Sequence, residues 1–365
     1  MKIAILTYHR ATNYGAVLQA YALQRKISQY LSQNDECQMI NYKCTSVEAM
    51  RKSIHFNKRF VKDIVRFPFV FLDDARCVKR FDQFLIKNMI IDEDCEDLSK
   101  LNNRYDIFIT GSDQVWNYDV CRDDETYFLD FVTENKKKRS YAASLGAQRL
   151  FERDKEKILN NLKSFPKLSV REKTGIDDLK EIVSDIRIDI DPTLLIEQDD
   201  WNRLIESDNN DGNYILIYCV APPKGLLEIA KRLQILTGYK VIYLTNQLSK
   251  KIKYRSFSYV SGIGPQDFLY YVKNAKYVLT TSFHGTVFSL IFHKLFYAEL
   301  DSLNGHNDRI DNLLKRAKAE IFADQTYLFK EDKNTMIDWE KIDIEIQHMR
   351  SESERYLKGV VSGDE

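Results

Sequence analysis

Segments rich in β-branched and aromatic residues alternate with amphipathic helical segments along most of this 365-residue chain. This alternation limits the fold more than any other feature, because alternating strands and helices form parallel sheets with helices on both faces. A dense cluster of turn-forming residues at 208–213 interrupts the rhythm, which then restarts. We therefore predict an α/β fold of two doubly wound parallel-sheet domains that face a central cleft.

The predicted elements divide the chain into three parts. We expect an N-terminal α/β domain over 1–207, a C-terminal α/β domain over 213–320 and a C-terminal helical tail over 321–365. One arrangement open to this tail is to pack back onto the first domain. The expected strands are 2–8, 38–42, 105–110, 128–131, 138–144, 167–171, 214–220, 240–245, 277–281 and 295–300. The expected helices are 16–31, 50–65, 76–88, 150–164, 224–237, 267–274, 284–293, 309–319 and 338–359.

The composition excludes several classes of protein. Lys plus Arg and Asp plus Glu both number 54, so the excess of positive charge that a generic nucleic-acid binder needs is missing. The six Cys show neither a CxxC pair nor zinc-finger spacing, which favours free thiols in a reducing cytosol. No window approaches about 18 uncharged apolar residues, and the apolar stretch at the N-terminus is too short for a signal peptide. We predict a cytoplasmic protein that binds no nucleic acid.

A basic, aromatic-bearing stretch runs from Arg51 to Arg66. A solvated helix face is the favoured interpretation. The alternative is a peripheral contact with the inner face of a membrane or with a lipid-linked diphosphate.

Polar loops follow several predicted strands, at the sheet edge where open α/β folds bind ligands. The segment Ser282-Phe283-His284-Gly285-Thr286 opens a helix, whose free N–H groups favour an anion. Gly285 permits close approach of a ligand, and His284 can donate a proton near neutral pH. The alternative, that Ser282 caps the helix while His284 binds a carbonyl, is equally consistent with these five residues.

Two arginines are candidates for binding an anion. Arg171, at the end of a predicted strand, can hold a carboxylate or phosphate with two parallel hydrogen bonds, although a surface pair with Glu172 is the simpler interpretation. Arg309 begins a predicted helix, where a cation is unfavourably placed in the helix dipole, and this misfit suggests a ligand role.

Two further loops carry groups suited to a sugar. The segment 111–117, Gly-Ser-Asp-Gln-Val-Trp-Asn, combines hydrogen-bonding groups with the flat face of Trp116, and Asp113 could accept a proton from a hydroxyl. An Asx-type turn with a half-buried Trp is the alternative. In the segment 13–16, Asn-Tyr-Gly-Ala, a helix cap by Asn13 or Thr12 is the favoured interpretation from the residues alone.

Taken together, these segments resemble the polysaccharide pyruvyl transferase family. They occur in the family's order and span most of residues 1–315. The matching segments are 13–16, 18–23, 111–117, 141–146, 169–172, 191–194 and 282–285.

The resemblance implies a two-domain fold of the GT-B type known from glycosyltransferases. It also implies transfer of pyruvate from phosphoenolpyruvate to a sugar of a bacterial surface polysaccharide or its lipid-linked precursor, with a pyruvate ketal as product and with neither a metal nor a cofactor. By position, His284 is similar to the family's essential histidine and Arg171 to the arginine that holds the donor. The expected catalytic residues are His284 and Asp113. The expected donor-binding residues are Arg171, Ser282, Gly285, Thr286 and Arg309. The expected acceptor-binding residues are Asn13, Tyr14, Gly15, Ser112, Gln114, Trp116 and Asn117.

The chain departs from the family pattern just before the histidine. Many members carry Arg or Asp shortly before the histidine, where this chain has Thr281 and Ser282, so the donor is expected to rely on Arg171, Arg309 and the helix N-terminus.

Two alternative functions stay open. A GT-B glycosyltransferase that uses a nucleotide sugar would share this architecture. A non-catalytic partner in a capsule-assembly complex is the other alternative, against which the joint presence of His284, Arg171 and Asp113 speaks.

Overall fold

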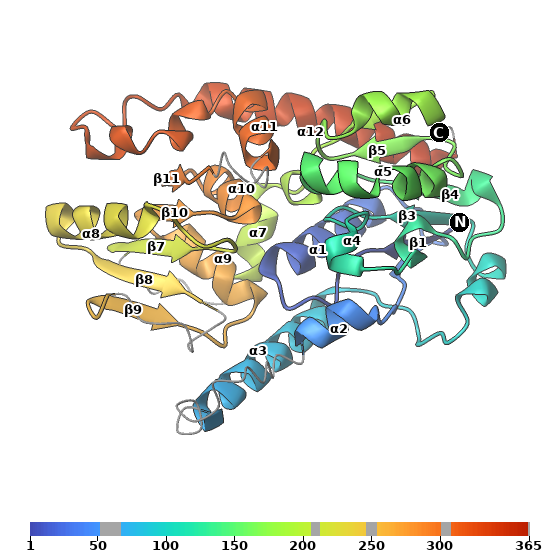
Figure 1. The fold of residues 1–365 in the computed structure, drawn as a ribbon, viewed down its shortest axis with the longest axis horizontal. Helices are drawn as coiled ribbons and strands as arrows, with labels where there is room; N and C mark the ends of the chain where they lie inside the picture. The colour runs from blue at the N-terminus through green and yellow to red at the C-terminus, as the bar shows by residue number, and fades with distance from the viewer. Residues whose placement is uncertain (52–66, 206–211, 246–253, 301–307, 364–365) are drawn as a thin grey trace.

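The computed structural model describes residues 1–51, 67–205, 212–245, 254–300 and 308–363, and within them every strand pair is parallel (Figure 1). The first sheet has the order β2-β1-β3-β4 and the second the order β11-β10-β7-β8-β9, while β5 and β6 form a separate pair. Single bridges from Ala143 to Asp113 and to Val170 join that pair to the first sheet. The strands are β1 (Lys2–Leu6), β2 (Glu36–Met39), β3 (Ile107–Thr110), β4 (Lys138–Ser140), β5 (Leu168–Val170), β6 (Ile186–Ile188), β7 (Tyr214–Tyr218), β8 (Lys240–Leu244), β9 (Phe257–Val260), β10 (Tyr277–Thr280) and β11 (Leu295–Ala298).

Helices cover the sheets, as the alternation in the sequence predicts. The central strands β3, β7 and β10 are buried along their whole length, which is typical of parallel strands with helices on both faces. The helices are α1 (Tyr14–Ser28), α2 (Thr45–Arg51), α3 (Phe67–Asn88), α4 (Tyr118–Cys121), α5 (Gln148–Leu162), α6 (Ile176–Ile182), α7 (Gln198–Leu204), α8 (Leu226–Thr237), α9 (Pro265–Asn274), α10 (Phe283–Ile291), α11 (Asp308–Arg316) and α12 (Trp339–Ser362).

The two halves of the molecule share a hydrophobic core. Tyr14, at the start of α1, is almost wholly buried and stacks on Phe268 of α9, with the ring centroids 4.9 Å apart. The same tyrosine lies 5.7 Å from the ring of Tyr218 on β7. Aromatic packing of this kind adds to the free energy gained by removing apolar surface from water. The start of α1 is thereby fixed against the second sheet.

The last helix, α12, contacts both halves (Figure 1). Near its start, Asp343 pairs with His293, which follows α10, at 2.9 Å. Near its end, the hydroxyl of Tyr356 donates to the carbonyl of Ser140 on β4 at 2.9 Å. The C-terminal segment therefore returns onto the first sheet after passing the second.

The predicted fold class is confirmed, and most predicted elements occur within a few residues of their expected bounds. The strand predicted at 128–131 is wrong: Thr126–Phe128 is a short 3₁₀ helix, and Leu129 has a left-handed backbone with φ 55° that ends it. The short strands β6 and β9 were not predicted from the pattern. No helix in the described part of the chain is long and apolar enough to cross a membrane.

Two expectations concern residues outside the described ones. The domain boundary expected at 208–213 overlaps 206–211, so the limits 1–207, 213–320 and 321–365 stay predictions. Most of the basic stretch 51–66 also lies outside the described residues. Arg51 itself is buried in α2, where its guanidinium donates to the carbonyl of Arg10, so this residue does not face a membrane.

Candidate active site

The N-termini of two helices from opposite halves meet at the candidate site. Helix α1 follows β1, and Asn13 caps it by accepting a hydrogen bond from the N–H of Ala16 at 3.2 Å. Helix α10 follows β10, and Ser282 caps it in the same way through the N–H of Gly285 at 3.2 Å. Both helices begin at the carboxyl ends of strands inside their sheets, where the positive ends of helix dipoles favour anions.

The imidazole of His284 lies directly against the first turn of α1. A methyl group built on Gly15 would be 1.9 Å from Nδ1 of His284, a distance that no pair of heavy atoms without a bond can adopt. Only glycine at position 15 leaves room for the ring. The two capping segments expected on different sides of the site, Asn13–Gly15 and Ser282–Gly285, therefore lie in contact.

Asp191 joins His284 to Arg171. Its carboxylate oxygen Oδ2 accepts from Nη1 of Arg171 at 2.7 Å and from the hydroxyl of Ser112 at 3.2 Å. The same oxygen lies 3.4 Å from Nε2 of His284. Its other oxygen, Oδ1, accepts from both the N–H and the hydroxyl of Thr193 at 3.0 and 2.7 Å, which caps the 3₁₀ helix Pro192–Leu194. Asp191 is thus held in one orientation by the first half while it faces a histidine of the second.

The charges in this cluster stabilise one another. Burial alone would raise the pKa of Asp191, but the neighbouring His284 and the Arg171 guanidinium hold it well below its usual range, so Asp191 is ionised. Burial would likewise lower the pKa of Arg171, and the carboxylates of Asp191 and Glu172 reverse that effect and raise it. Arg171 is therefore a fully charged guanidinium in a buried position.

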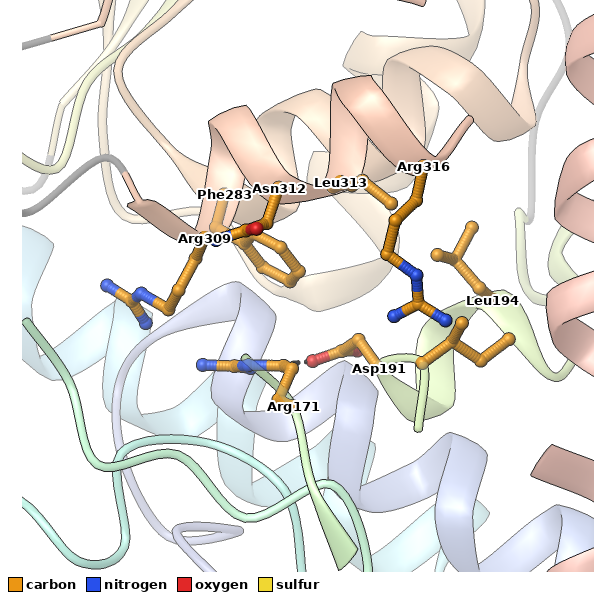
Figure 2. Close-up of a pocket in the computed structure, with 9 residues that line it drawn as sticks. Arg171, Asp191, Leu194, Phe283, Arg309, Asn312, Leu313 and Arg316 are labelled. Carbon is orange, nitrogen blue, oxygen red and sulfur yellow. Dashed lines mark hydrogen bonds and ion pairs between the residues drawn. The ribbon is translucent and has the colours of Figure 1, made fainter. Parts of the chain in front are cut away.

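A pocket opens beside this cluster, between the end of β5 and helix α11 (Figure 2). Arg171 and Asp191 form one wall, and Arg309 and Arg316 reach in from α11 on the other. The remaining lining residues are Ile190, Leu194, Phe283, Asn312 and Leu313. The guanidinium carbon of Arg171 lies 4.7 Å from the centre of the Phe283 ring, a cation–π distance that fixes it at the pocket wall.

The three expected donor-binding residues on or beside α10 complete its first turn. Ser282 and Thr286 are buried, and the Thr286 hydroxyl donates to the Ser282 carbonyl at 3.1 Å. A methyl group on Gly285 would lie 2.3 Å from Oγ1 of Thr280, so the close neighbour that requires a glycine here is strand β10. Their part in binding a donor stays a prediction.

The expected acceptor loop divides between two environments. Ser112 is wholly buried beside Arg171 and Asp191, and so belongs to the same cluster as the donor-side residues. Asp113 is half-buried with a left-handed backbone at φ 84°, and its Oδ1 accepts from the N–H of Gln114, also half-buried. Asn117 is buried, donates to Oε1 of Gln114 at 2.8 Å and caps α4 through the N–H of Asp119.

Two aromatic residues expected to contact the acceptor are enclosed by the protein instead. Trp116 has no exposed surface, stacks at 6.0 Å on Phe128 and donates its Nε1–H to the carbonyl of Tyr127. The expectation that it offers a flat face to a sugar is wrong, because both faces are covered. Tyr14 is also buried, at the junction of the halves, so the expectation that it contacts the acceptor is wrong as well.

Two site residues were not predicted from the sequence. Asp191 enters the sequence prediction only as part of the matching segment 191–194, although a carboxylate before Pro after a strand is suited to capping and ion pairing. Arg316 is absent from the residues that the sequence predicts for the site. The signal was present, since positions 309, 312, 313 and 316 follow the i, i+3, i+4, i+7 spacing that places residues on one face of a helix. No group of three or more His, Cys, Asp or Glu within the described residues could hold a metal ion.

Solved structures with a similar fold define the class. They include a UDP-N-acetylglucosamine 2-epimerase from Listeria monocytogenes described as putative in its title, with 12% identity over 95% of this chain and 90% of that one and a TM-score of 0.53. MnaA of S. aureus with UDP has 12% identity over 95% of both chains and a TM-score of 0.51. The Neisseria meningitidis epimerase with UDP-GlcNAc has 9% identity over 97% and 99% of the chains and a TM-score of 0.50. At such low identity the likeness shows the fold alone, which is the GT-B fold.

Within that fold, the chain belongs to the polysaccharide pyruvyl transferase family, whose model matches residues 13–298. The match includes Asn13, Arg171, Asp191 and His284 and ends before α11. No curated protein sequence matches the chain.

Proposed function

We propose that this protein transfers pyruvate from phosphoenolpyruvate to two hydroxyls of one sugar, in a bacterial surface polysaccharide or its lipid-linked precursor, and so forms a cyclic pyruvate ketal. Membership of the family supports pyruvyl transfer to a polysaccharide in general. The observation that supports this donor is the pocket beside His284. Three guanidinium groups and one carboxylate are among the groups that line it, so positive charge is in excess there. Phosphoenolpyruvate carries a carboxylate and a phosphate on one carbon, and guanidinium groups bind both groups well.

The reaction requires an acid on the donor. Carbon C3 of the enol gains a proton, which leaves C2 electron-poor, and a sugar hydroxyl then bonds to C2 and loses its proton. Phosphate next departs with the electrons of its C2–O bond, and a second hydroxyl of the same sugar bonds to C2 and loses its proton. The sum is one donor and one diol converted to one ketal and one inorganic phosphate.

His284 is assigned the acid in this scheme. Its ring is oriented on one side by Gly15 and on the other by the ionised Asp191, so its position is fixed before a donor arrives. General acid catalysis of this kind is worth about 10²–10⁴-fold in rate. Arg171, held by Asp191 and Phe283, is assigned to an anionic group of the donor, and Arg309 to the same pocket. Asp113 is assigned the base that accepts a hydroxyl proton.

The test is release of inorganic phosphate from phosphoenolpyruvate in the presence of a panel of nucleotide-linked and lipid-linked sugars. We expect His284→Ala to lower turnover by about 10²–10⁴-fold at saturating donor and acceptor. The control variant His348→Ala, which removes an exposed histidine of α12, retains wild-type turnover. Near-normal turnover of His284→Ala would refute the assignment of the acid.

The rival activity is glycosyl transfer from a nucleotide sugar. The S. aureus and N. meningitidis structures contain UDP or UDP-GlcNAc, so the same fold accommodates such ligands in other proteins. Incubation with radiolabelled phosphoenolpyruvate in one arm and UDP-sugars as donors in the other distinguishes the two. Label from a UDP-sugar in the product, and none from phosphoenolpyruvate, would replace the proposed function with the rival.

A further inference from the structure

Helix α11 presents two arginines to the pocket from opposite ends of its inner face. Arg309 and Arg316 are seven residues apart, which corresponds to two helical turns and roughly 10 Å along the axis. In Figure 2, Arg309 extends to the same side as Arg171, whereas Arg316 reaches down from the other end of α11 toward Asp191. Cationic groups therefore lie at both ends of one pocket.

The positive charge of Arg309 and Arg316 is only partly compensated. Among the described residues, neither Arg309 nor Arg316 takes part in a hydrogen bond or ion pair. Burial lowers the pKa of both guanidinium groups, and Arg171 lowers that of Arg309 further. Carboxylates act against this effect only in part: Glu172, Asp113 and Asp191 at Arg309, and Asp189 and Glu352 at Arg316. Two nitrogens of Arg171, Nε and Nη2, are buried without a hydrogen-bond partner, although Nε lies 3.6 Å from Oε2 of Glu172. Buried donors that lack acceptors are costly, so this arrangement is suited to a ligand that supplies them.

The wall between the two cationic ends is apolar. Phe283, Leu313 and Leu194 line it, and Asp191 is the one carboxylate of the described lining. The chemistry of this lining suits a small ligand with two anionic groups joined by a short apolar part, because each anionic group would pair with a guanidinium while the apolar part would contact the side chains between them.

We propose that α11 forms the second wall of the donor site, and that Arg316 binds one anionic group of phosphoenolpyruvate while Arg171 and Arg309 bind the other. This inference rests on the proposed function and adds a residue to it. Arg316 then determines specificity: a small acid with a single anionic group, such as pyruvate, leaves one guanidinium of the pocket without a partner. Arg316 lies beyond residue 298, where the match to the family ends.

The experiment measures binding to the full-length chain by calorimetry, with phosphoenolpyruvate, pyruvate and inorganic phosphate as separate probes. Arg316→Gln removes the charge, and we expect it to weaken the affinity for phosphoenolpyruvate at least tenfold, about the value of one charge-assisted hydrogen bond. It also weakens the affinity for one of the two single-group probes and leaves the other unchanged. Arg316→Lys, which keeps the charge without the planar fork, recovers part of the lost affinity.

The matched control is Lys315→Gln, which removes one positive charge from the adjacent position of the same helix. Lys315 is exposed and pairs with Asp311 at 2.7 Å, so this variant binds all three probes like the wild type. Thermal unfolding confirms that each variant is folded before its affinity is compared.

The remaining outcomes separate the two proposals. If the wild-type protein binds phosphoenolpyruvate and Arg316→Gln binds it equally well, the role of Arg316 is refuted and the proposed function stands. If Arg316→Gln weakens pyruvate and phosphate to the same extent, or if Lys315→Gln has the same effect, Arg316 acts only through the general electric field, and the inference is again refuted. If the wild type neither binds nor turns over phosphoenolpyruvate, both proposals fail together.

Discussion

The imidazole of His284 occupies the space that a side chain at Gly15 would fill, with 1.9 Å between Nδ1 and the position of the added carbon. These two residues belong to the first turns of helices that cover different sheets. Their contact means that the orientation of the candidate acid in one half is determined by the backbone of the other.

Gly15→Ala is predicted to abolish most activity without unfolding the protein. The added methyl group displaces the histidine ring, and turnover falls by about 10²–10⁴-fold, the value of the lost acid catalysis. The free energy of unfolding falls by about 1–3 kcal/mol, because the displaced ring strains its buried surroundings, and the protein stays folded. Turnover and urea unfolding are measured on the same preparations.

Gly225→Ala provides the matched control for this variant. A methyl group at Gly225, the residue that caps α8, would lie at an ordinary 3.4 Å from Glu299, so its activity stays at the wild-type level. A Gly15→Ala protein that retains its turnover would show that the ring position is not required.

Asp191→Asn is predicted to cost both stability and activity. The substitution removes the charge that faces Arg171 at 2.7 Å and His284 at 3.4 Å inside the protein. Because an unpaired buried charge is left behind, we expect the free energy of unfolding to fall by about 3 kcal/mol. Asp311→Asn, which breaks an exposed pair with Lys315, costs less than about 1 kcal/mol. Equal unfolding curves for the two variants would mean that Glu172 alone compensates Arg171.

Trp116→Phe distinguishes a structural tryptophan from one that binds a sugar. The variant loses the hydrogen bond to the Tyr127 carbonyl and leaves a small cavity, so we expect the protein to lose about 1–3 kcal/mol of stability. The KM for the acceptor is expected to change by less than about twofold, because the ring is enclosed. An acceptor KM that rises tenfold in a stably folded variant would restore the sugar-binding role.

His9 is predicted to make the folded state sensitive to mild acid. Burial, together with the nearby Arg10 and Arg51 charges, lowers its pKa from 6.5 to about 4. The unfolded chain therefore binds a proton that the folded chain does not between those values, so stability is complete above about pH 6.5 and declines as the pH falls toward 4. From pH 8 to pH 5 the loss through this group is about 2 kcal/mol.

The contribution of His9 is isolated by substitution. Asn at position 9 keeps a donor for the Thr7 carbonyl, which Nδ1 of His9 contacts at 3.1 Å, but does not titrate. Urea unfolding of His9→Asn at pH 8 and pH 5 should show a smaller difference than the wild type, whereas His348→Asn, at an exposed position, should match the wild type. Asp191, whose pKa is lowered, affects stability only at lower pH, near and below the pKa of an unfolded carboxyl. Identical pH dependence in all three proteins would contradict the prediction.

The sequence predicts the framework of this fold well because its central elements have strong periodicity. The helix after β10 and the buried strand β7 both occur where the pattern places them. Short elements are not predicted because three or four residues are too few to show a periodicity. Strand β6, for example, is half-buried along its length and resembles a loop in sequence. The segment 128–131 has the composition of a strand, but the left-handed backbone of Leu129 is a tertiary effect that no local pattern shows.

The sequence predicts individual residues of the site but not the contacts between them. Arg171 and His284 stand out because strand ends and helix starts are where α/β proteins bind ligands. Asp191 connects them across distant parts of the chain, and only the packing of the halves brings these groups within 3.4 Å. Trp116 shows the opposite error, since an aromatic residue among polar neighbours indicates a sugar site in sequence whether its faces are open or covered.

Helix α12 is one continuous rod-like helix of 24 residues that is attached to both halves. Asp343 pairs with His293 near one end, and Tyr356 donates a hydrogen bond to the Ser140 carbonyl near the other. A hinge motion that separated the sheets widely would have to break one of these attachments or bend the rod. We therefore expect substrate entry and product exit to involve small rotations and side-chain movements, which keep the histidine and the arginines close together.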